Sequence, residues 1–343
     1  MEITLILNTH MPYVLSKGNL FDEPENWLFE AITETYIPLF ETLNNWKVED
    51  YSGKKIILSL TPCLLEQLQT CKPRYHEYLK LMQKIALFEV ERTQQIDLYN
   101  KYQKHPQALT NNELSLIHKS AQHYLKRISH CLDFIEQHDF IPYIRKILTR
   151  NRHHLEVWTS TPNHNFLPFY QKNTAKHFIQ SGIKKFEDIL SHKADGFWLP
   201  ECAFMPGLEE MLIEAGVKKT ALVPSAIESY HPEIKSGLYK FKQLELLIHD
   251  FRLSMHVWQA PKDTLPSNPV YREFYRDMGL DVTADYFKDL NINIPPPGSA
   301  PSGVAFNLLR TVVATLVWAK NTYMTGRKRM RKQKKTLKSS STL

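Results

Sequence analysis

The 343-residue chain contains only four cysteines, and their spacing excludes the usual uses of clustered thiols. Cys63, Cys71, Cys131 and Cys202 form no Cys-x-x-Cys pair and no dense pattern of the kind that cross-links small secreted domains. We therefore expect reduced thiols and a cytoplasmic protein. The N-terminal stretch MEITLILNTH agrees, because it has no basic region and too short an apolar run for a signal peptide.

Common nucleotide and metal motifs are also missing. The chain has no P-loop, no Gly-x-Gly-x-x-Gly and no His-Glu-x-x-His, so no phosphate-binding loop and no zinc-protease helix is predicted. A barrel deacetylase would need an Asp/His metal set, which Asn8-Thr9-His10 does not supply. The adjacent pair His153-His154 is poorly arranged for one metal. We predict no metal and no cofactor.

Acidic residues are absent from the last part of the chain. Residues 291–343 carry ten Lys or Arg and no Asp or Glu, whereas residues 1–290 carry 33 basic and 36 acidic side chains. The formal net charge of +7 therefore comes from the tail, and the body is slightly acidic. A nucleic-acid partner is not predicted for the body, because its charge has the wrong sign.

The tail lacks an apolar run long enough to span a membrane. Residues 306–319 are mostly apolar, but Arg310 interrupts them, and a span needs about 20 apolar residues. We predict no membrane partner for the body. The basic run at 326–335 leaves a nucleic-acid or anionic-lipid contact open for the tail.

Short apolar runs that alternate with helical patterns dominate the body. The helical patterns include residues 27–43, 208–216 and a long charged stretch at about 75–150, which we interpret as a helical excursion that serves as scaffold, with a lid as the alternative. This alternation predicts an α/β fold. The predicted strands lie at 3–8, 55–60, 155–159, 197–199, 217–224 and 246–250.

Polar side chains follow three of these strands. His10 and His164 come shortly after the first and third strands, and Glu201 follows the fourth, beside the aromatic Trp198. In an α/β barrel the chemistry lies at the carboxyl ends of the strands. We therefore expect these side chains to line one cleft, although a lone histidine is more often structural and a loop glutamate more often solvated. Glu156 lies inside a strand and should need a partner or face the barrel interior.

Several blocks resemble a known family. WLPECAF at 198–204, followed by PGLE, resembles the nucleophile motif of glycoside hydrolase family 57, in the branch of the 1,4-α-glucan branching enzymes. The HMP at 10–12 is similar to the family's opening signature, and residues 155–164 resemble its second motif. VYREFYRDMG at 270–279 is similar to a block of the branching-enzyme branch. The blocks occur in the family's order over about residues 3–290.

The resemblance implies an incomplete seven-stranded (β/α) barrel as the catalytic domain over residues 1–290, with the helical insertion at about 75–150. It implies an α-glucan partner and a retaining glycosidase or transglycosylase in which Glu201 is the nucleophile. Such enzymes pair a nucleophile with an acid about 5–5.5 Å away. Arg252 resembles the arginine of a GRD-type segment, whereas core packing is the alternative for each tryptophan. The resemblance suggests His10, His164 and Arg252 as substrate-binding residues, and Trp198 and Trp258 are added as aromatic side chains that could line the cleft.

The activity most similar to this pattern is that of a 1,4-α-glucan branching enzyme of starch or glycogen metabolism. A 4-α-glucanotransferase or α-amylase of the same family is the nearest alternative. A non-catalytic α-glucan-binding remnant is a third. SAIESY at 225–230 stands where the branching enzymes usually carry Asp-x-His-Gly, and this departure bears on the exact activity more than on the family.

No segment of the chain resembles the family's general-acid motif, Tyr-Asp-x-Glu-Leu-Phe-Gly-His-Trp-Trp. Because the tail at 291–343 also has no acid, we expect it to be an aberrant, out-of-frame or truncated end that is largely disordered. Residues 324–334 can be encoded by synonymous codons that, when the reading frame begins one base earlier, translate as the mixed-charge sequence YDWQKAHEKAK. General acid catalysis is worth about 10²–10⁴-fold, so the chain is expected to be catalytically impaired.

Overall fold

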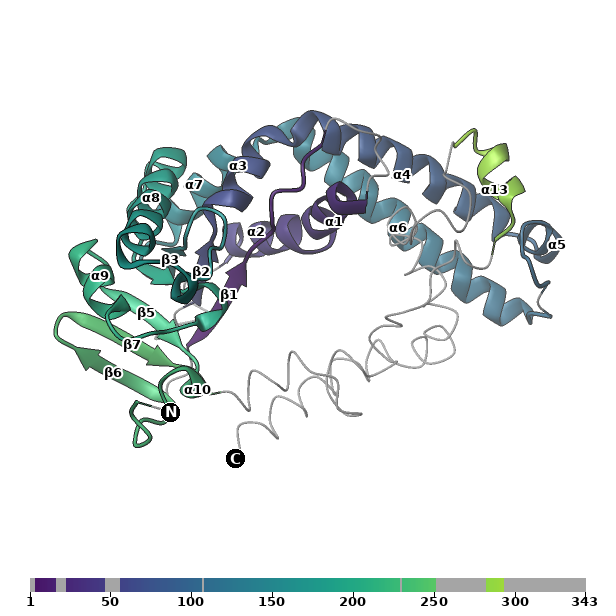
Figure 1. Cartoon of the computed structure of the whole chain (residues 1–343). Coiled ribbons are helices and arrows are strands. Elements are labelled where there is room, and N and C mark those ends of the chain that lie inside the picture. Colours follow the sequence, from purple (N-terminus) through teal and green to yellow (C-terminus); the bar gives the residue numbers. More distant parts are fainter. Residues whose placement is uncertain are drawn as a thin grey trace. The chain divides into compact units, whose positions relative to one another are not determined.

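The computed structural model describes residues 4–16, 23–46, 56–106, 108–228, 230–250 and 282–292, which fall into two compact units (Figure 1). The first unit comprises Met1–Leu15, Thr35–Pro73 and Gln137–Arg252. The second unit takes the intervening segments and the C-terminal part of the chain. Arg252, Trp258, the block at 270–279 and the tail after residue 292 lie outside the described residues, so the domain boundary at 290 stays a prediction.

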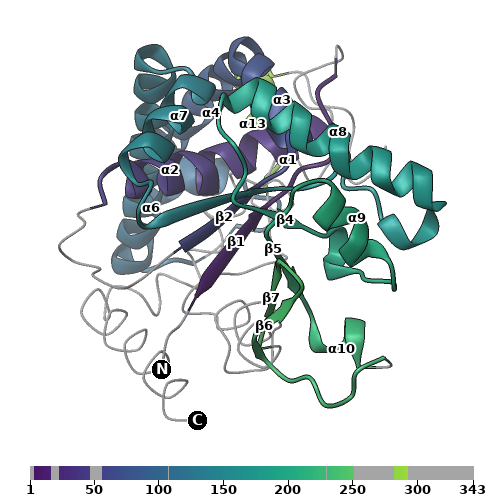
Figure 2. The same ribbon diagram turned by 90° about the vertical axis from the view of Figure 1, so that its left-hand side faces the viewer.

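A seven-stranded sheet forms the centre of the first unit, curled like half of a barrel wall (Figure 2). Neighbouring strands are parallel, except that β6 is antiparallel to β7. The predicted α/β class and the seven strands are therefore confirmed. In spatial order the strands are β1 (Leu5–Thr9), β2 (Ile56–Leu60), β3 (Leu155–Thr159), β4 (Gly196–Trp198), β5 (Lys219–Leu222), β7 (Leu244–Ile248) and β6 (Gly237–Phe241).

The edge strand β6 is the one strand that the apolar runs did not predict. Four of its five residues, Gly237–Phe241, are exposed. An antiparallel edge strand can face water and needs no continuous apolar run, whereas the buried parallel strands do. The six predicted runs correspond to the other strands, with ends shifted by a few residues.

In the first unit, α7 packs against α2, α3 and α8, and α8 also packs against α9. Helix α3 starts sharply because Thr61 caps its N-terminus and Pro62 occupies its first turn. The bounds of these helices are α2 Ile37–Asn44, α3 Pro62–Thr70, α7 Phe140–Arg150, α8 Lys172–Leu190, α9 Leu208–Glu214 and α10 Pro224–Ile227.

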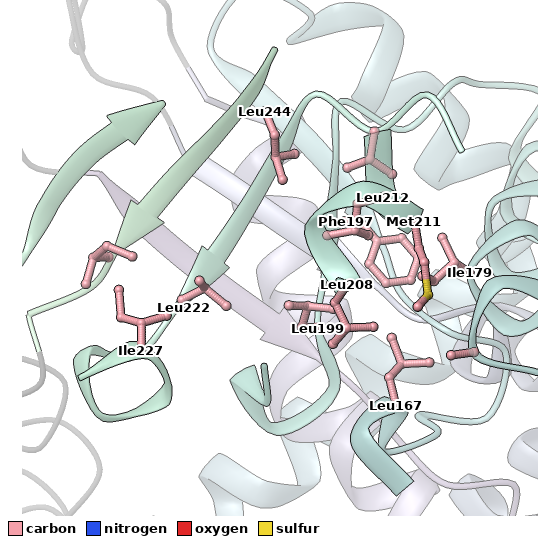
Figure 3. Packing of buried hydrophobic residues seen from close by; sticks show 13 residues of the cluster. Leu167, Ile179, Phe197, Leu199, Leu208, Met211, Leu212, Leu222, Ile227 and Leu244 are labelled. Atoms are coloured by element: carbon pink, nitrogen blue, oxygen red, sulfur yellow. The ribbon is translucent and has the colours of Figure 1, made fainter. Parts of the chain in front are cut away.

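The two faces of the sheet carry different cores, because strand side chains alternate with a period of two. The outer face packs against α8 and α9 through a cluster that includes Phe197, Leu199 and Leu222 (Figure 3). The inner face holds a smaller cluster around Trp158 with Ile57 and Ala221. The sequence of each strand therefore decides which side chains line the inside of the curled sheet.

The second unit is helical, and it confirms helices across much of the predicted excursion at 75–150. Its interior holds Glu89 and Arg92, both nearly inaccessible, with Nε and Oε1 2.5 Å apart. Tyr286 of α13 donates to Glu89 Oε1 at 2.6 Å, which fixes α13 to α4. Within the described residues no helix is long and apolar enough to cross a membrane. The helices are α1 (Glu23–Ala31), most of α4 (Lys72–Arg92), α5 (Ile96–Lys101), nearly all of α6 (Asn111–Gln137) and α13 (Ala284–Asp289).

The helix predicted over 27–43 is divided in the structure. Between α1 and α2 the chain widens into the π-helix η1, Ile32–Tyr36. Pro38 lies in the first turn of α2 and cannot donate a backbone hydrogen bond to the preceding turn, which explains the change of winding.

Candidate active site

Three predicted site residues lie at the carboxyl ends of strands β1, β3 and β4. His10 directly follows β1, and His164 lies on the loop after β3. Glu201 is the middle residue of a short 3-10 turn, η4 (Pro200–Cys202), that begins after β4. Because these strands belong to the parallel part of the sheet, their carboxyl ends meet at the same edge.

The backbone at this edge adopts conformations that non-glycine residues avoid. Glu201 has φ 57° and ψ 19°, and Cys202 and His164 have φ 52° and 56°. Such left-handed residues cost of order 1–3 kcal/mol and need support from their surroundings. Cys202 donates its N–H to the carbonyl of Leu199 at 2.8 Å, and both residues are buried. The packed turn therefore holds Glu201 so that its side chain stays 72% exposed.

The two histidines and the glutamate form one contact group. The rings of His10 and His164 stack with centroids 4.0 Å apart and planes 14° from parallel. His164 Nε2 lies 3.4 Å from Glu201 Oε1. The structure thus brings together His10, His164 and Glu201, which are 37 or more residues apart in the chain.

Burial keeps both imidazoles neutral at pH 7. The pKa of His10 falls to about 4, first because the ring is desolvated and then because His164 is close, with Glu201 acting in the opposite direction. Burial also lowers the pKa of His164. Because the His164 ring is neutral, its 3.4 Å approach to the Glu201 carboxylate is a close polar contact rather than an ion pair.

Cys202 does not compete with Glu201 as a nucleophile. Burial and the neighbouring Glu201 charge raise the pKa of its thiol to about 12. The thiolate is the reactive form of cysteine, and it is scarcely populated at neutral pH with such a pKa.

Strands β2, β3 and β4 and the loop after β3 carry buried polar atoms without a partner. Among the described residues, Trp158 Nε1, Trp198 Nε1 and His164 Nδ1 are buried and make no hydrogen bond. Ser59 Oγ is in the same state, and its strand register places it beside Trp158. Native proteins rarely leave such groups unsatisfied, so a hydroxyl-rich ligand or water would find several partners here.

The remaining predicted residues divide into those with a clear structural setting and those outside the described ranges. Trp198 packs against the inner cluster of the sheet while its indole N–H lacks a partner. Glu156 has the partner that its place in a strand required, because Lys219 Nζ lies 2.7 Å from Oε1. In the part of the chain that the structure describes, no three His, Cys, Asp or Glu side chains converge on a possible metal site.

Two residues that hold this edge in place did not stand out in the sequence. The hydroxyl oxygen of Thr61 lies 3.3 Å from His10 Nδ1. The side-chain amide of Gln67 donates a hydrogen bond to the carbonyl of Pro12, two residues after His10. The signal for Thr61 is present in the sequence, because a threonine before Pro62 and a helical run is a helix cap. Nothing local in the sequence marks Gln67.

The profile of Glycosyl hydrolase family 57 matches residues 4–254. The chain belongs to this family. The match covers the three site residues, and the family assignment predicted from WLPECAF is confirmed.

Individual relatives agree with the family, and this chain matches only part of each of them. A 1,4-alpha-glucan branching enzyme of Thermococcus kodakarensis is 33% identical over 215 residues, which are 60% of this chain and 28% of that protein. The crystal structure of the alpha-amylase AmyC from Thermotoga maritima superimposes with a TM-score of 0.68 at 28% identity, over 83% of this chain and 52% of that one. The branching-enzyme structure from Pyrococcus horikoshii gives 0.65 at 24% identity, over 80% and 51%, and supports the fold alone.

This chain therefore spans about a quarter to a half of the length of the relatives that it matches. The matched region supports the fold and the family membership of this chain.

Proposed function

We propose that this family 57 chain acts on α-1,4-glucans by a retaining mechanism, with Glu201 as the nucleophile. The observation that carries the proposal is the contact group at the sheet edge, in which neutral His164 lies 3.4 Å from the Glu201 carboxylate and stacks on His10. A nucleophilic carboxylate has to be ionised and held in one direction. The packed η4 turn and the nearby His164 supply the fixed direction.

In the proposed first step, a Glu201 carboxylate oxygen attacks the anomeric carbon of a bound glucan. The bond from that carbon to the glycosidic oxygen breaks, its electron pair leaves with the oxygen, and a glycosyl ester forms on Glu201. The departing oxygen needs a proton from a second carboxyl group, because an unprotonated sugar oxygen is a poor leaving group. His10, with its N–H group, serves to hold sugar hydroxyls beside the reacting carbon.

Transfer of the glycosyl group to another glucan chain, as in a 1,4-α-glucan branching enzyme, is the activity that we favour. The branching enzyme at 33% identity supports this choice. The alpha-amylase structure at 28% identity supports hydrolysis as the second candidate within the family, beside 4-α-glucanotransferase. A glucan-binding remnant without turnover is the candidate from another class.

Turnover and binding on amylose separate these possibilities. Because no general-acid motif was found in the chain, we expect the 343-residue protein to form α-1,6 branches only slowly, about 10²–10⁴-fold below an intact enzyme. A debranching enzyme converts these branches into short linear chains that chromatography can count. Glu201→Gln should lower the rate by about 10³-fold or more while leaving amylose binding nearly unchanged. Asp188→Asn, an equally charge-neutralising change on an exposed part of α8, serves as the control and should keep the wild-type rate.

Binding without turnover in both the wild-type protein and the Asp188→Asn variant would favour the remnant. Full turnover by Glu201→Gln would rule out Glu201 as the nucleophile.

A further inference from the structure

Thr61 joins helix α3 to the histidine pair. It is fully buried between β2 and α3, where its Oγ1 accepts the backbone N–H of Leu64 at 3.4 Å as the helix cap. The same oxygen lies 3.3 Å from His10 Nδ1. One hydroxyl therefore serves a helix terminus and a candidate site residue at once.

The Thr61 hydroxyl can donate only one hydrogen bond, and this determines which nitrogen of the His10 ring carries the proton. A threonine hydroxyl has one proton to donate and two lone pairs to accept with. Leu64 N–H takes one lone pair, and His10 Nδ1 is the acceptor that the hydroxyl proton can reach among the described residues. If Nδ1 carried a proton instead, it would donate to Oγ1 and leave a buried hydroxyl proton without an acceptor, which is unfavourable.

We propose that Thr61 is a positioning residue that holds His10 as the Nε2–H tautomer, so that His10 offers a hydrogen-bond donor to the ligand. Thr61 donates to Nδ1, and the proton of the neutral ring resides on Nε2. His10 then binds an oxygen acceptor, such as a sugar hydroxyl, rather than a donor.

A second residue of α3 fixes the backbone that carries this ring. Gln67, fully buried, donates to the carbonyl of Pro12 at 2.9 Å and accepts the N–H of Val14 at 2.8 Å. His10 thus sits between a clamped loop and the ring of His164, whose centroid lies 4.0 Å away. Helix α3 therefore controls the position of His10 through Gln67 and its tautomer through Thr61.

In this arrangement the two histidines offer different hydrogen-bonding groups. His164 Nε2 lies 3.4 Å from Glu201 Oε1, and its Nδ1 is buried without a hydrogen-bond partner. Beside it, Nε2–H of His10 is a donor. The ligand-facing part of this inference rests on the proposed α-glucan function, whereas the tautomer itself does not.

Nitrogen NMR of the imidazole tests the tautomer without any activity measurement. Two-bond ¹H–¹⁵N spectra of the ¹⁵N-labelled protein at pH 7 distinguish a protonated from an unprotonated ring nitrogen, and His10→Gln identifies the signals by their loss. We expect a protonated Nε2 and an unprotonated Nδ1. Thr61→Val, which removes the hydroxyl at nearly constant shape, should shift the ring toward the other tautomer, and Thr61→Ser should restore the wild-type pattern.

A cap variant elsewhere controls for simple loss of helix stability. Thr110 caps α6 in the other unit by accepting Glu113 N–H at 3.3 Å, and Thr110→Val should leave the His10 spectrum unchanged. A wild-type spectrum with a protonated Nδ1 would overturn the proposal even if Thr61→Val does not fold. An unchanged His10 spectrum in folded Thr61→Val would overturn it as well.

Maltoheptaose titrations then test the ligand-facing role separately. Thr61→Val should bind about threefold to tenfold more weakly than Thr110→Val, the loss expected for one hydrogen bond. A changed tautomer with unchanged affinity would overturn the contact between His10 and glucan while leaving the assigned tautomer in place.

Discussion

At the scale of single residues, the site is defined by three side chains, and burial sets the charge of the two histidines. Glu201 is exposed, whereas His164 is only 11% exposed and His10 is half-buried. Desolvation therefore keeps the histidines neutral, and a neutral imidazole can donate and accept at the same time. A protonated pair at 4.0 Å would repel itself. The histidine pair is thus suited to hydrogen bonding with a neutral sugar rather than to ion pairing.

The lowered pKa of His10 makes the folded state sensitive to acid. The folded pKa is about 4, below the ordinary 6.5, so the unfolded chain binds the extra proton first as the pH falls. Between about pH 6.5 and 4 the free energy of unfolding should therefore decrease, with the full loss reached below about pH 4. His164 contributes with the same sign.

Urea unfolding at several pH values between 7 and 4 measures this effect. His10→Asn should unfold with a shallower pH dependence than the wild-type protein, because it lacks the group that titrates. Equal slopes for the two proteins would show that His10 is not the titrating group.

At the scale of elements, the site depends on close packing of α8 and β4 against β3. A methyl group at Gly182 of α8 would lie 2.1 Å from the carbonyl oxygen of Ser160. One at Gly196 would lie 2.5 Å from the Trp158 ring. Only glycine allows these approaches. The loop that carries His164 starts at Ser160, so the packing of α8 sets its position.

Gly182→Ala should therefore damage both stability and site. We expect a loss of about 3 kcal/mol in the free energy of unfolding, as for other overpacked interiors, because the clash involves backbone atoms. Lys184→Ala, at an exposed position two residues along α8, should change stability by less than about 0.5 kcal/mol. Denaturant unfolding compares the two. A Gly182→Ala variant as stable as Lys184→Ala would contradict the close approach.

The strands were predictable from the sequence to within a few residues, and the details of the turns were not. Buried parallel strands must be continuous apolar runs, so the residues directly after them, among them His10 and Glu201, could be assigned to one edge. The left-handed backbone of Glu201 and Cys202 has no local signal, because neither residue is glycine. The hydrogen bonds of Gln67 span more than 50 residues, and only the folded chain reveals them.

At the scale of the whole molecule, the net charge of the sequence misleads about its ligand. The +7 arises from the basic tail, and residues 1–290 carry 33 basic and 36 acidic side chains. The described site adds one exposed carboxylate and two neutral rings. This charge distribution favours a neutral polysaccharide over a polyanion.

Amylose binding should therefore depend weakly on salt. We expect the dissociation constant to change by less than about threefold between 50 and 500 mM NaCl, because no phosphate-like charges are neutralised and no counterions are released. Isothermal titration with maltoheptaose at both salt concentrations measures it. A steep loss of affinity with salt would point to an anionic ligand.

Covalent labelling tests the central claim, that Glu201 attacks the anomeric carbon, most directly. With α-maltotriosyl fluoride the leaving group is fluoride, which needs no protonation, so the first step does not require the second carboxyl group. After a rapid acid quench, mass spectrometry of the intact protein and of its peptides should show one maltotriosyl group on the peptide that contains Glu201, and none in Glu201→Gln. Equal labelling of Glu201→Gln, or a label on any other peptide, would contradict the account.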